Sequence, residues 1–252
     1  MPLHVRRKEE AMGLFDNMFS KKNCAICGKE LGVFGKTKLG DGAYLCKDCN
    51  GKLSPYFTAY GSATVDSIRE QLAYREQNAA NLASFNVTNT IAAGAKNVYV
   101  DEDAGNLIIT THTDWRQHNP DIIAYSQVTG CEVEVKEVRT ELKRKDAEGK
   151  EVSFNPPRYD IDYDVFVHAY FDHPYFTQIT WKVNGSRIET KGSTQYREAV
   201  SRAEAVRDAL AGHRAEARAA AAPKQAVNCP YCCATTIPDA QGRCEYCGSA
   251  LI

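Results

Sequence analysis

The sequence predicts an α+β protein of several domains, and three observations lead to this class. Eight of the ten cysteines form four Cys-x-x-Cys pairs, two pairs near each end of the chain. Residues 97–183 contain short segments in which apolar and polar residues alternate, as is typical of strands. A segment with apolar residues at helical spacing lies on each side of this region. The 252 residues, 43% hydrophobic and 25% charged, are enough for a core that folds unaided.

The first element is the segment 21–57, which carries two cysteine pairs separated by eighteen residues. A Cys-x-x-Cys knuckle presents two thiolates, so two knuckles complete the tetrahedral shell of Zn²⁺. Gly28 follows one knuckle directly and suits the positive φ that such turns often need. We expect a zinc ribbon with a closed, structural site. Its ligand candidates are Cys24, Cys27, Cys46 and Cys49.

The segment 223–252 repeats this pattern, with eleven residues between its two cysteine pairs. Its ligand candidates are Cys229, Cys232, Cys244 and Cys247. Cys233 is an alternative to Cys232, although the two-residue spacing favours Cys232. Redox-active dithiols and iron–sulfur clusters are the rival interpretations of both sets. A redox motif is usually a single Cys-x-x-Cys pair, whereas here two such pairs lie close together at each end of the chain. We therefore expect two structural Zn²⁺ ions.

The segment 58–85 predicts a linker helix after the first ribbon. Thr64 is a candidate N-cap, and Asp66 lies in the first turn, where an acidic residue is favourable. The helix should bury one apolar stripe on its neighbouring domain. The stripe consists of Val65, Ile68, Leu72, Ala79 and Leu82.

The segment 86–222 predicts an antiparallel sheet followed by a long helix. "NVYV" and "NLIITT" flank the turn "DEDAG", and "DIIAYSQVTGCEVEVKEVRTEL", "YDIDYDVFVHAYF" and "YFTQITWKV" follow as strands. Asp160, Asp162 and Asp164 share one strand face, which we interpret as solvated or cross-strand paired. The insert "KRKDAEGKEVSFNPPR" predicts a turn or mobile loop. The helix, from residue 193 on, has its apolar face at Tyr196, Ala199, Val200, Ala203, Val206 and Leu210.

Two blocks of this sequence resemble known proteins. "LFDNMFSKKNCAICGKELGVFGKTKLGDGAYLCKDCNGKLSPYF", the helix after it and "IIAYSQVTGCEVEV" resemble an uncharacterised bacterial zinc-ribbon family of unknown function. The resemblance implies a pleckstrin-homology-like (PH-like) domain after the ribbon, which is a small, bent sheet capped by a C-terminal helix. "CPYCCATTIPDAQGRCEYCG" looks like the generic ribbons appended to many bacterial proteins. The resemblance implies an architecture and no mechanism.

The start of the chain predicts neither a secretion signal nor a membrane span. Residues 1–20 are interpreted as an N-terminal extension, with Met12 as a candidate natural start, and Leu14, Phe15, Met18 and Phe19 as an apolar patch that packs on the ribbon or sheet. We therefore expect a cytoplasmic protein without a transmembrane segment.

No short motif supplies the nucleophile, base and orienting group of an enzyme, so we expect a non-enzymatic protein. His112, Asp114 and His118 form the one cluster that suggests a further metal or an acid/base pair, although a polar loop explains them as well. Cys131 is interpreted as a buried thiol, and His168 and His173 need no special role.

Charge separates the remaining functional classes. Residues 86–184 hold ten basic and sixteen acidic residues, a net charge of −6 that opposes phosphate binding. The first ribbon is about +2 once four thiolates and one Zn²⁺ are counted, and the second is about −2. We therefore expect an intracellular scaffold or adaptor that mediates protein–protein interaction with an unidentified partner. Nucleic-acid binding by the first ribbon is the alternative, through Lys21, Lys22, Lys36 and Lys38.

Overall fold

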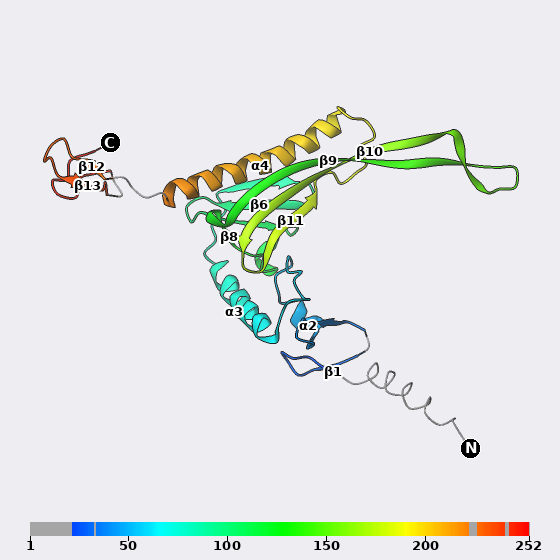
Figure 1. Ribbon diagram of the computed structural model, residues 1–252, viewed down its shortest axis with the longest axis horizontal. Coiled ribbons are helices and arrows are strands. Elements are labelled where there is room, and N and C mark those ends of the chain that lie inside the picture. The colour runs from blue at the N-terminus through cyan, green and yellow to red at the C-terminus, as the bar shows by residue number, and fades with distance from the viewer. Residues whose placement is uncertain (1–21, 33, 222–225, 240–241, 252) are drawn as a thin grey trace, which may run out of the picture. The chain divides into compact units, whose positions relative to one another are not determined.

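The computed structural model describes residues 22–32, 34–221, 226–239 and 242–251 (Figure 1). The expectations for residues 1–20 and for Lys21 lie outside the described residues. The chain divides into two compact units, residues 1–214 and 215–252. The long helix α4, Thr194–Ala221, contains the boundary between them.

The described residues between 22 and 57, called here the N-terminal module, form two short hairpins and one helical turn. Strand β1 (Lys22–Asn23) pairs with β2 (Glu30–Leu31), and β3 (Lys36–Lys38) pairs with β4 (Tyr44–Cys46). Helix α2 (Lys47–Asn50) follows β4 directly. The small core of the module contains Leu39, Leu45 and Leu53 together with cysteine side chains. The module therefore has the ribbon-like form that the cysteine spacing predicts.

Helix α3, Val65–Asn81, begins at the predicted cap. The Thr64 hydroxyl accepts a hydrogen bond from the Ser67 N–H, and the Ser67 hydroxyl accepts one from the Thr64 N–H. The predicted apolar stripe is only partly correct, because Ala79 is exposed and Val65 and Leu72 are half-buried. Three of the four buried residues inside the helix are polar, namely Gln71, Arg75 and Asn78. For Arg75 and Asn78 the physical reason is a buried polar network with residues 119–122, described below. Among the described residues, no group forms a hydrogen bond with the buried side-chain amide of Gln71.

The body of the protein contains two antiparallel sheets. The first has the order β5 (Asn89–Ala93), β6 (Lys96–Asp101), β7 (Asn106–Thr110) and β8 (Ile123–Ala124). The one-turn 3₁₀ helices η1 (Trp115–Gln117) and η2 (Tyr125–Gln127) lie on either side of β8. Strand β5 falls in the segment 86–96, for which the sequence suggested no strand.

The second sheet has the order β11 (Phe176–Lys182), β10 (Glu151–His173) and β9 (Val128–Lys145). The two sheets meet closely beyond β5, since a side chain on Gly94 would collide with the Val183 carbonyl. Gly94 has a φ of 71°, which also favours glycine. The Trp181 indole N–H donates to the Ala93 carbonyl at 2.9 Å and joins β11 to β5.

Strands β9 and β10 continue beyond the body as a two-stranded arm (Figure 1). The insert 143–158, expected as a turn or mobile loop, belongs largely to these strands, and the hairpin turn is confined to 146–150. The expectation of a loop is therefore wrong. Pairing shifts between Ser153 and Arg158, so a bulge accommodates the Pro156–Pro157 pair that cannot donate to the ladder.

The aspartates on one face of β10 form ion pairs with basic side chains. This agrees with the second of the two interpretations of this face, solvated or paired. Arg187 contacts Asp160 at 2.6 Å and Asp162 at 2.7 Å. Lys182, on the neighbouring strand β11, contacts Asp164 at 2.5 Å. The opposite face of β10 contributes Val165, Val167 and Ala169 to the core.

Helix α4 lies along the sheets of the body (Figure 1). Four of the six residues predicted for its apolar face are buried, namely Ala199, Ala203, Val206 and Leu210, and the other two, Tyr196 and Val200, are half-buried. Tyr196 packs edge-on against Tyr163 of β10 with ring centroids 5.7 Å apart. The body is thus sheet-rich and followed by a C-terminal helix.

The described residues between 226 and 251, called here the C-terminal module, form a small unit with little regular structure. Strand β12 (Val227–Asn228) pairs with β13 (Thr235–Thr236), and Arg243 forms an isolated bridge with Ala250. In the part of the chain that the structure describes, no helix combines the length and apolar character needed to cross a bilayer.

Candidate metal centres

The N-terminal module brings its four cysteine sulfurs together. The Sγ atoms of Cys24, Cys27, Cys46 and Cys49 all lie within 4.8 Å of one another. Cys27 Sγ and Cys46 Sγ, from opposite knuckles, are 3.7 Å apart. A tetrahedral ion with metal–sulfur bonds near 2.3 Å separates its ligands by about 3.8 Å. The spacing of these thiols therefore fits one four-coordinate metal ion.

Backbone hydrogen bonds fix the two knuckles of this site. The Gly28 N–H donates to the Cys24 carbonyl at 2.9 Å, and the Cys24 N–H donates to the Lys29 carbonyl at 2.9 Å. The second knuckle is different, because Cys46 is the N-cap of α2 and its sulfur accepts a bond from the Cys49 N–H at 3.3 Å. The Cys49 N–H thus stabilises negative charge on the Cys46 sulfur, whereas the two bonds of the first knuckle hold its backbone.

The surroundings of the thiols shift the pKa values of Cys24 and Cys49 in opposite directions. Burial raises the pKa of Cys24, but backbone hydrogen bonds from Cys27, Cys46 and Ile26 outweigh burial and lower the pKa to about 6. Burial and then the neighbouring cysteine sulfurs raise the pKa of Cys49 well above its usual value. Four adjacent thiolates repel one another, so the last of them becomes charged only with a compensating metal ion.

The C-terminal module forms a second cluster with the same spacing. Its members Cys229, Cys232, Cys244 and Cys247 also have all sulfurs within 4.8 Å. The two Sγ–Sγ distances across the knuckles, Cys229 to Cys247 and Cys232 to Cys244, are both 3.6 Å. The structure thus places Cys232 in the cluster. Cys233 lies outside it and is exposed.

A buried polar junction joins the N-terminal module and α3 to the loop between β7 and β8. Arg75 donates to Asp121 at 2.6 Å, and both side chains are almost fully buried. Ser54 donates to the other oxygen of Asp121 at 2.7 Å. Tyr56 donates to the Ile109 carbonyl at 2.6 Å. Sequence reasoning missed this junction, because a charged pair in two separate segments leaves no apolar periodicity.

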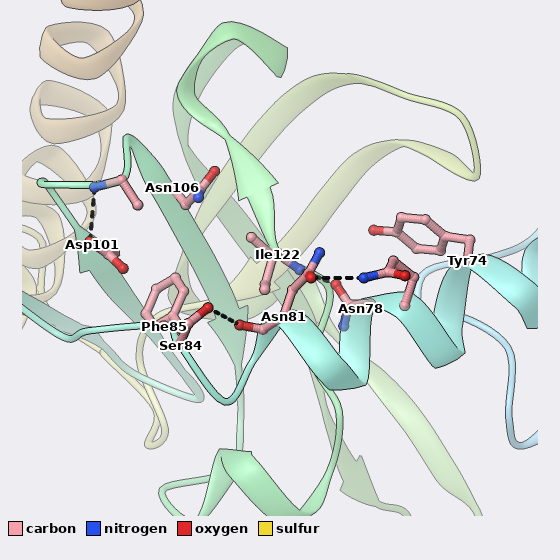
Figure 2. Close-up of a pocket in the computed structure, with 10 residues that line it drawn as sticks. Tyr74, Asn78, Asn81, Ser84, Phe85, Asp101, Asn106 and Ile122 are labelled. Carbon is pink, nitrogen blue, oxygen red and sulfur yellow. Dashed lines mark hydrogen bonds between the residues drawn. The ribbon is translucent and has the colours of Figure 1, made fainter.

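Next to the junction, α3 and the first sheet line a half-open cavity of 310 Å³ (Figure 2). Asn78 lines it from α3 and donates to the Asn119 side chain and the Pro120 carbonyl, while its own oxygen accepts from the Ile122 N–H. Asp101 lines the other end and accepts from the Asn86 and Ala104 N–H groups. Asn78 and Asp101 are thus already hydrogen-bonded to backbone groups around the cavity, and we assign them a structural role.

The remaining sequence candidates have defined places. His112, Asp114 and His118 do lie together, with ligand atoms within 4.8 Å of one another. Cys131 is half-buried and not fully buried as expected; burial still raises the pKa of its thiol to about 11, so little thiolate is present at neutral pH. His168 pairs with Glu134 at 3.0 Å, and His173 contacts the Tyr74 hydroxyl at 3.0 Å.

The lysines proposed for nucleic-acid binding are partly gathered around one ring. Lys22 and Lys36 lie over Tyr44, with Nζ-to-centroid distances of 5.8 and 5.3 Å. Lys38 ends strand β3, two residues after Lys36.

Comparison with known proteins identifies only the first part of the chain. No curated protein and no solved structure matches it. Residues 22–71, which hold the first cysteine cluster and the beginning of α3, match the family described as "Domain of unknown function (DUF4428)".

Proposed function

We propose that the two cysteine clusters each hold one structural Zn²⁺. The sulfur spacing of 3.6–3.7 Å across the knuckles supports this, together with the all-thiolate donor sets, which are typical of structural zinc. A shell closed by four protein ligands leaves no coordination position for water, so the ions stabilise structure. Elemental analysis of the purified chain should give two zinc ions per molecule. One metal per chain, or iron, would contradict the assignment.

On this framework, we propose a non-enzymatic scaffold or adaptor that mediates protein–protein interaction. The observation that carries the proposal is the pair of tyrosines at the knuckles of the C-terminal module. Tyr231 and Tyr246 occupy the same position in their Cys-x-Tyr-Cys turns and are 72% and 70% exposed. Exposed aromatic residues on a rigid support lose little entropy on binding and are enriched in interface hot spots.

The surrounding surface supports the same role. Within the described residues, the C-terminal module also exposes Val227 and Ile237. Phe34 of the N-terminal module is 93% exposed. Both metal-stapled modules thus present large apolar side chains, and such surface is typical of sites that bind another protein.

Affinity capture from native lysate tests this proposal with matched variants. Replacing Tyr231→Ser and Tyr246→Ser together should remove the captured proteins, because the two exposed rings are lost. Tyr159→Ser removes another exposed tyrosine, on the arm, and should leave capture unchanged. Zinc content and melting curves should be the same for all three proteins. The proposal is wrong if the double variant retains every partner of the wild type.

We further assign the body to a PH-like domain in the cytoplasm. The succession of antiparallel strands followed by a helix packed on the sheets supports the assignment of the fold. The close approach of Gly94 to Val183, where the two sheets meet, corresponds to the bend of such a sheet. Thiolate metal ligands have to stay reduced, which supports a cytoplasmic location.

Nucleic-acid binding by the N-terminal module is the second candidate, and the grouping of Lys22 and Lys36 over Tyr44 favours it. The acidic charge of residues 86–184 opposes it. Duplex DNA at physiological salt should therefore bind no more tightly than about micromolar. Nanomolar binding that Lys36→Ala weakens, or loss of captured partners after nuclease treatment, would favour this second candidate.

A further inference from the structure

The loop between β7 and β8 carries three metal-binding side chains that belong to neither cysteine cluster. His112 lies just beyond the end of β7. Asp114 and His118 flank η1 as its N-cap and C-cap residues, so one 3₁₀ turn separates them. All three side chains are exposed, and their ligand atoms lie within 4.8 Å of one another.

The donor spacing already approaches that of a coordination shell. Asp114 Oδ1 and His118 Nε2 are 3.3 Å apart. Nitrogen and oxygen ligands about 2.0–2.2 Å from a tetrahedral ion lie roughly 3.3–3.5 Å from each other. The ring of His112 stacks on that of His118, with centroids 3.6 Å apart and planes inclined by 13°. A ring nitrogen of His112 lies within 4.8 Å of the ligand atoms of Asp114 and His118.

Packing and hydrogen bonds with the body of the protein hold the backbone of this loop in place. Trp115, between the two flanking ligands, is buried and packs edge-on against Phe85 with ring centroids 5.5 Å apart. Arg116 covers the Trp115 ring and donates to the Phe85 carbonyl at 3.0 Å. Asp121 pins the far end of the loop through its pair with Arg75. The ligands therefore project from a fixed turn, and little backbone ordering is needed on binding.

We propose that His112, Asp114 and His118 form a third metal site, which takes a divalent transition-metal ion such as Zn²⁺ or Co²⁺. Two imidazoles and one carboxylate are a donor set for borderline metals. Three protein ligands leave at least one coordination position open to water or to another molecule. This site thus differs in kind from the two closed cysteine clusters, and it does not depend on the interaction role proposed above.

Titration of Co²⁺ tests the site in the tag-free full chain, which holds one Zn²⁺ in each cysteine cluster and has been dialysed to remove the metal that the open third site holds more weakly. Wild type should bind one further equivalent. The bound cobalt should show d–d absorption without a sulfur-to-cobalt charge-transfer band, because its ligands are nitrogen and oxygen. His112→Ala and His118→Ala should each weaken this binding by at least about tenfold. The melting curves of these variants should stay unchanged, since both side chains are exposed.

His168→Ala is the control, because His168 is a partly exposed histidine outside the proposed site that also has a carboxylate partner, Glu134. This variant should bind the third equivalent like wild type. Three results would overturn the proposal: no third equivalent at millimolar Co²⁺, binding that survives both His112→Ala and His118→Ala, or a charge-transfer band that shows cobalt entering the cysteine clusters.

Discussion

At the residue scale, three of the four cysteine knuckles share one backbone conformation. The residue after the second cysteine has positive φ in each: Gly28 at 76°, Gly248 at 72° and Cys233 at 59°. Its N–H donates to the carbonyl of the first cysteine in all three turns, at 2.8–2.9 Å. Cys233 therefore occupies a glycine position, and a side chain there costs roughly 1–2 kcal/mol in left-handed backbone.

Cys233→Gly should consequently stabilise the C-terminal module, by up to about 1 kcal/mol. Zinc release to a competing chelator should become slower, and the chain should still hold two metal ions. Gly248→Ala is the reciprocal change and should speed zinc release. A drop to one metal ion in Cys233→Gly would instead identify Cys233 as a ligand.

The grouping of the cysteines into two clusters of four could be predicted at this scale, because a Cys-x-x-Cys spacing constrains geometry locally. Cys233 shows the limit of such reasoning. Its role as a turn residue depends on its positive φ, and a cysteine in a sequence does not indicate positive φ in the way that a glycine does. The sequence likewise left two interpretations of His112 and His118, a side-chain cluster or an ordinary polar loop. The structure shows that the two rings stack beside η1.

At the element scale, helix α3 is attached by a buried ion pair. Arg75 and Asp121 are 7% and 0% exposed, so neither charge can be solvated once its partner is removed. Ser54 and the Asn119 carbonyl complete the hydrogen bonds of the pair, and Ser54 comes from the N-terminal module. The pair thus connects three segments of the chain through one carboxylate and one guanidinium.

Asp121→Ala should lower the free energy of unfolding by about 3–5 kcal/mol, because it leaves the Arg75 charge buried without a partner. Asp48→Ala removes a pair with Lys29 on the surface, where solvent screens both charges, and should lower the free energy of unfolding far less than Asp121→Ala. Denaturant unfolding measures both. Arg75→Met combined with Asp121→Leu should be less destabilised than Asp121→Ala alone. Equal effects of Asp121→Ala and Asp48→Ala would contradict a buried junction.

Elements could be predicted where local rules decide them. The Thr64 cap, the alternation in β10 and the apolar face of α4 are of this kind. The buried face of α3 could not be predicted, because its buried residues Arg75 and Asn78 are stabilised by partners more than forty residues away. The arm was missed because charged residues and Pro156–Pro157 are usual in loops, whereas a two-stranded ribbon exposed to solvent tolerates both.

At the scale of the whole molecule, the two cysteine clusters belong to different compact units. The sequence predicted their order along the chain, and it could not show how far each contributes to the core. The first cluster shares its core with Leu39, Leu45 and Leu53 and with Ile68 of α3. The module around it is also joined to the loop before β8 through Ser54 and Asp121. The second cluster lies in the unit 215–252.

Loss of one ligand should therefore have unequal consequences at the two sites. Cys46→Ser removes a buried ligand that is also the N-cap of α2, and it forfeits much of a metal-binding free energy of order 10 kcal/mol. Since the exposed core would include Ile68 of α3, the main melting temperature should fall, or the protein should aggregate. Cys244→Ser should unfold only the smaller unit and leave the main transition within a few degrees of wild type.

Calorimetry of the two variants beside wild type distinguishes the possible outcomes, with zinc content measured on the same samples. Each variant should lose one metal ion, which shows that the intended site has been emptied. Equal large shifts of the main transition would mean that the unit 215–252 stabilises the rest of the chain. Equal small shifts would mean that the body keeps its stability when the first metal site is lost. The junction of Arg75, Asp121 and Ser54 would then persist without a folded N-terminal module.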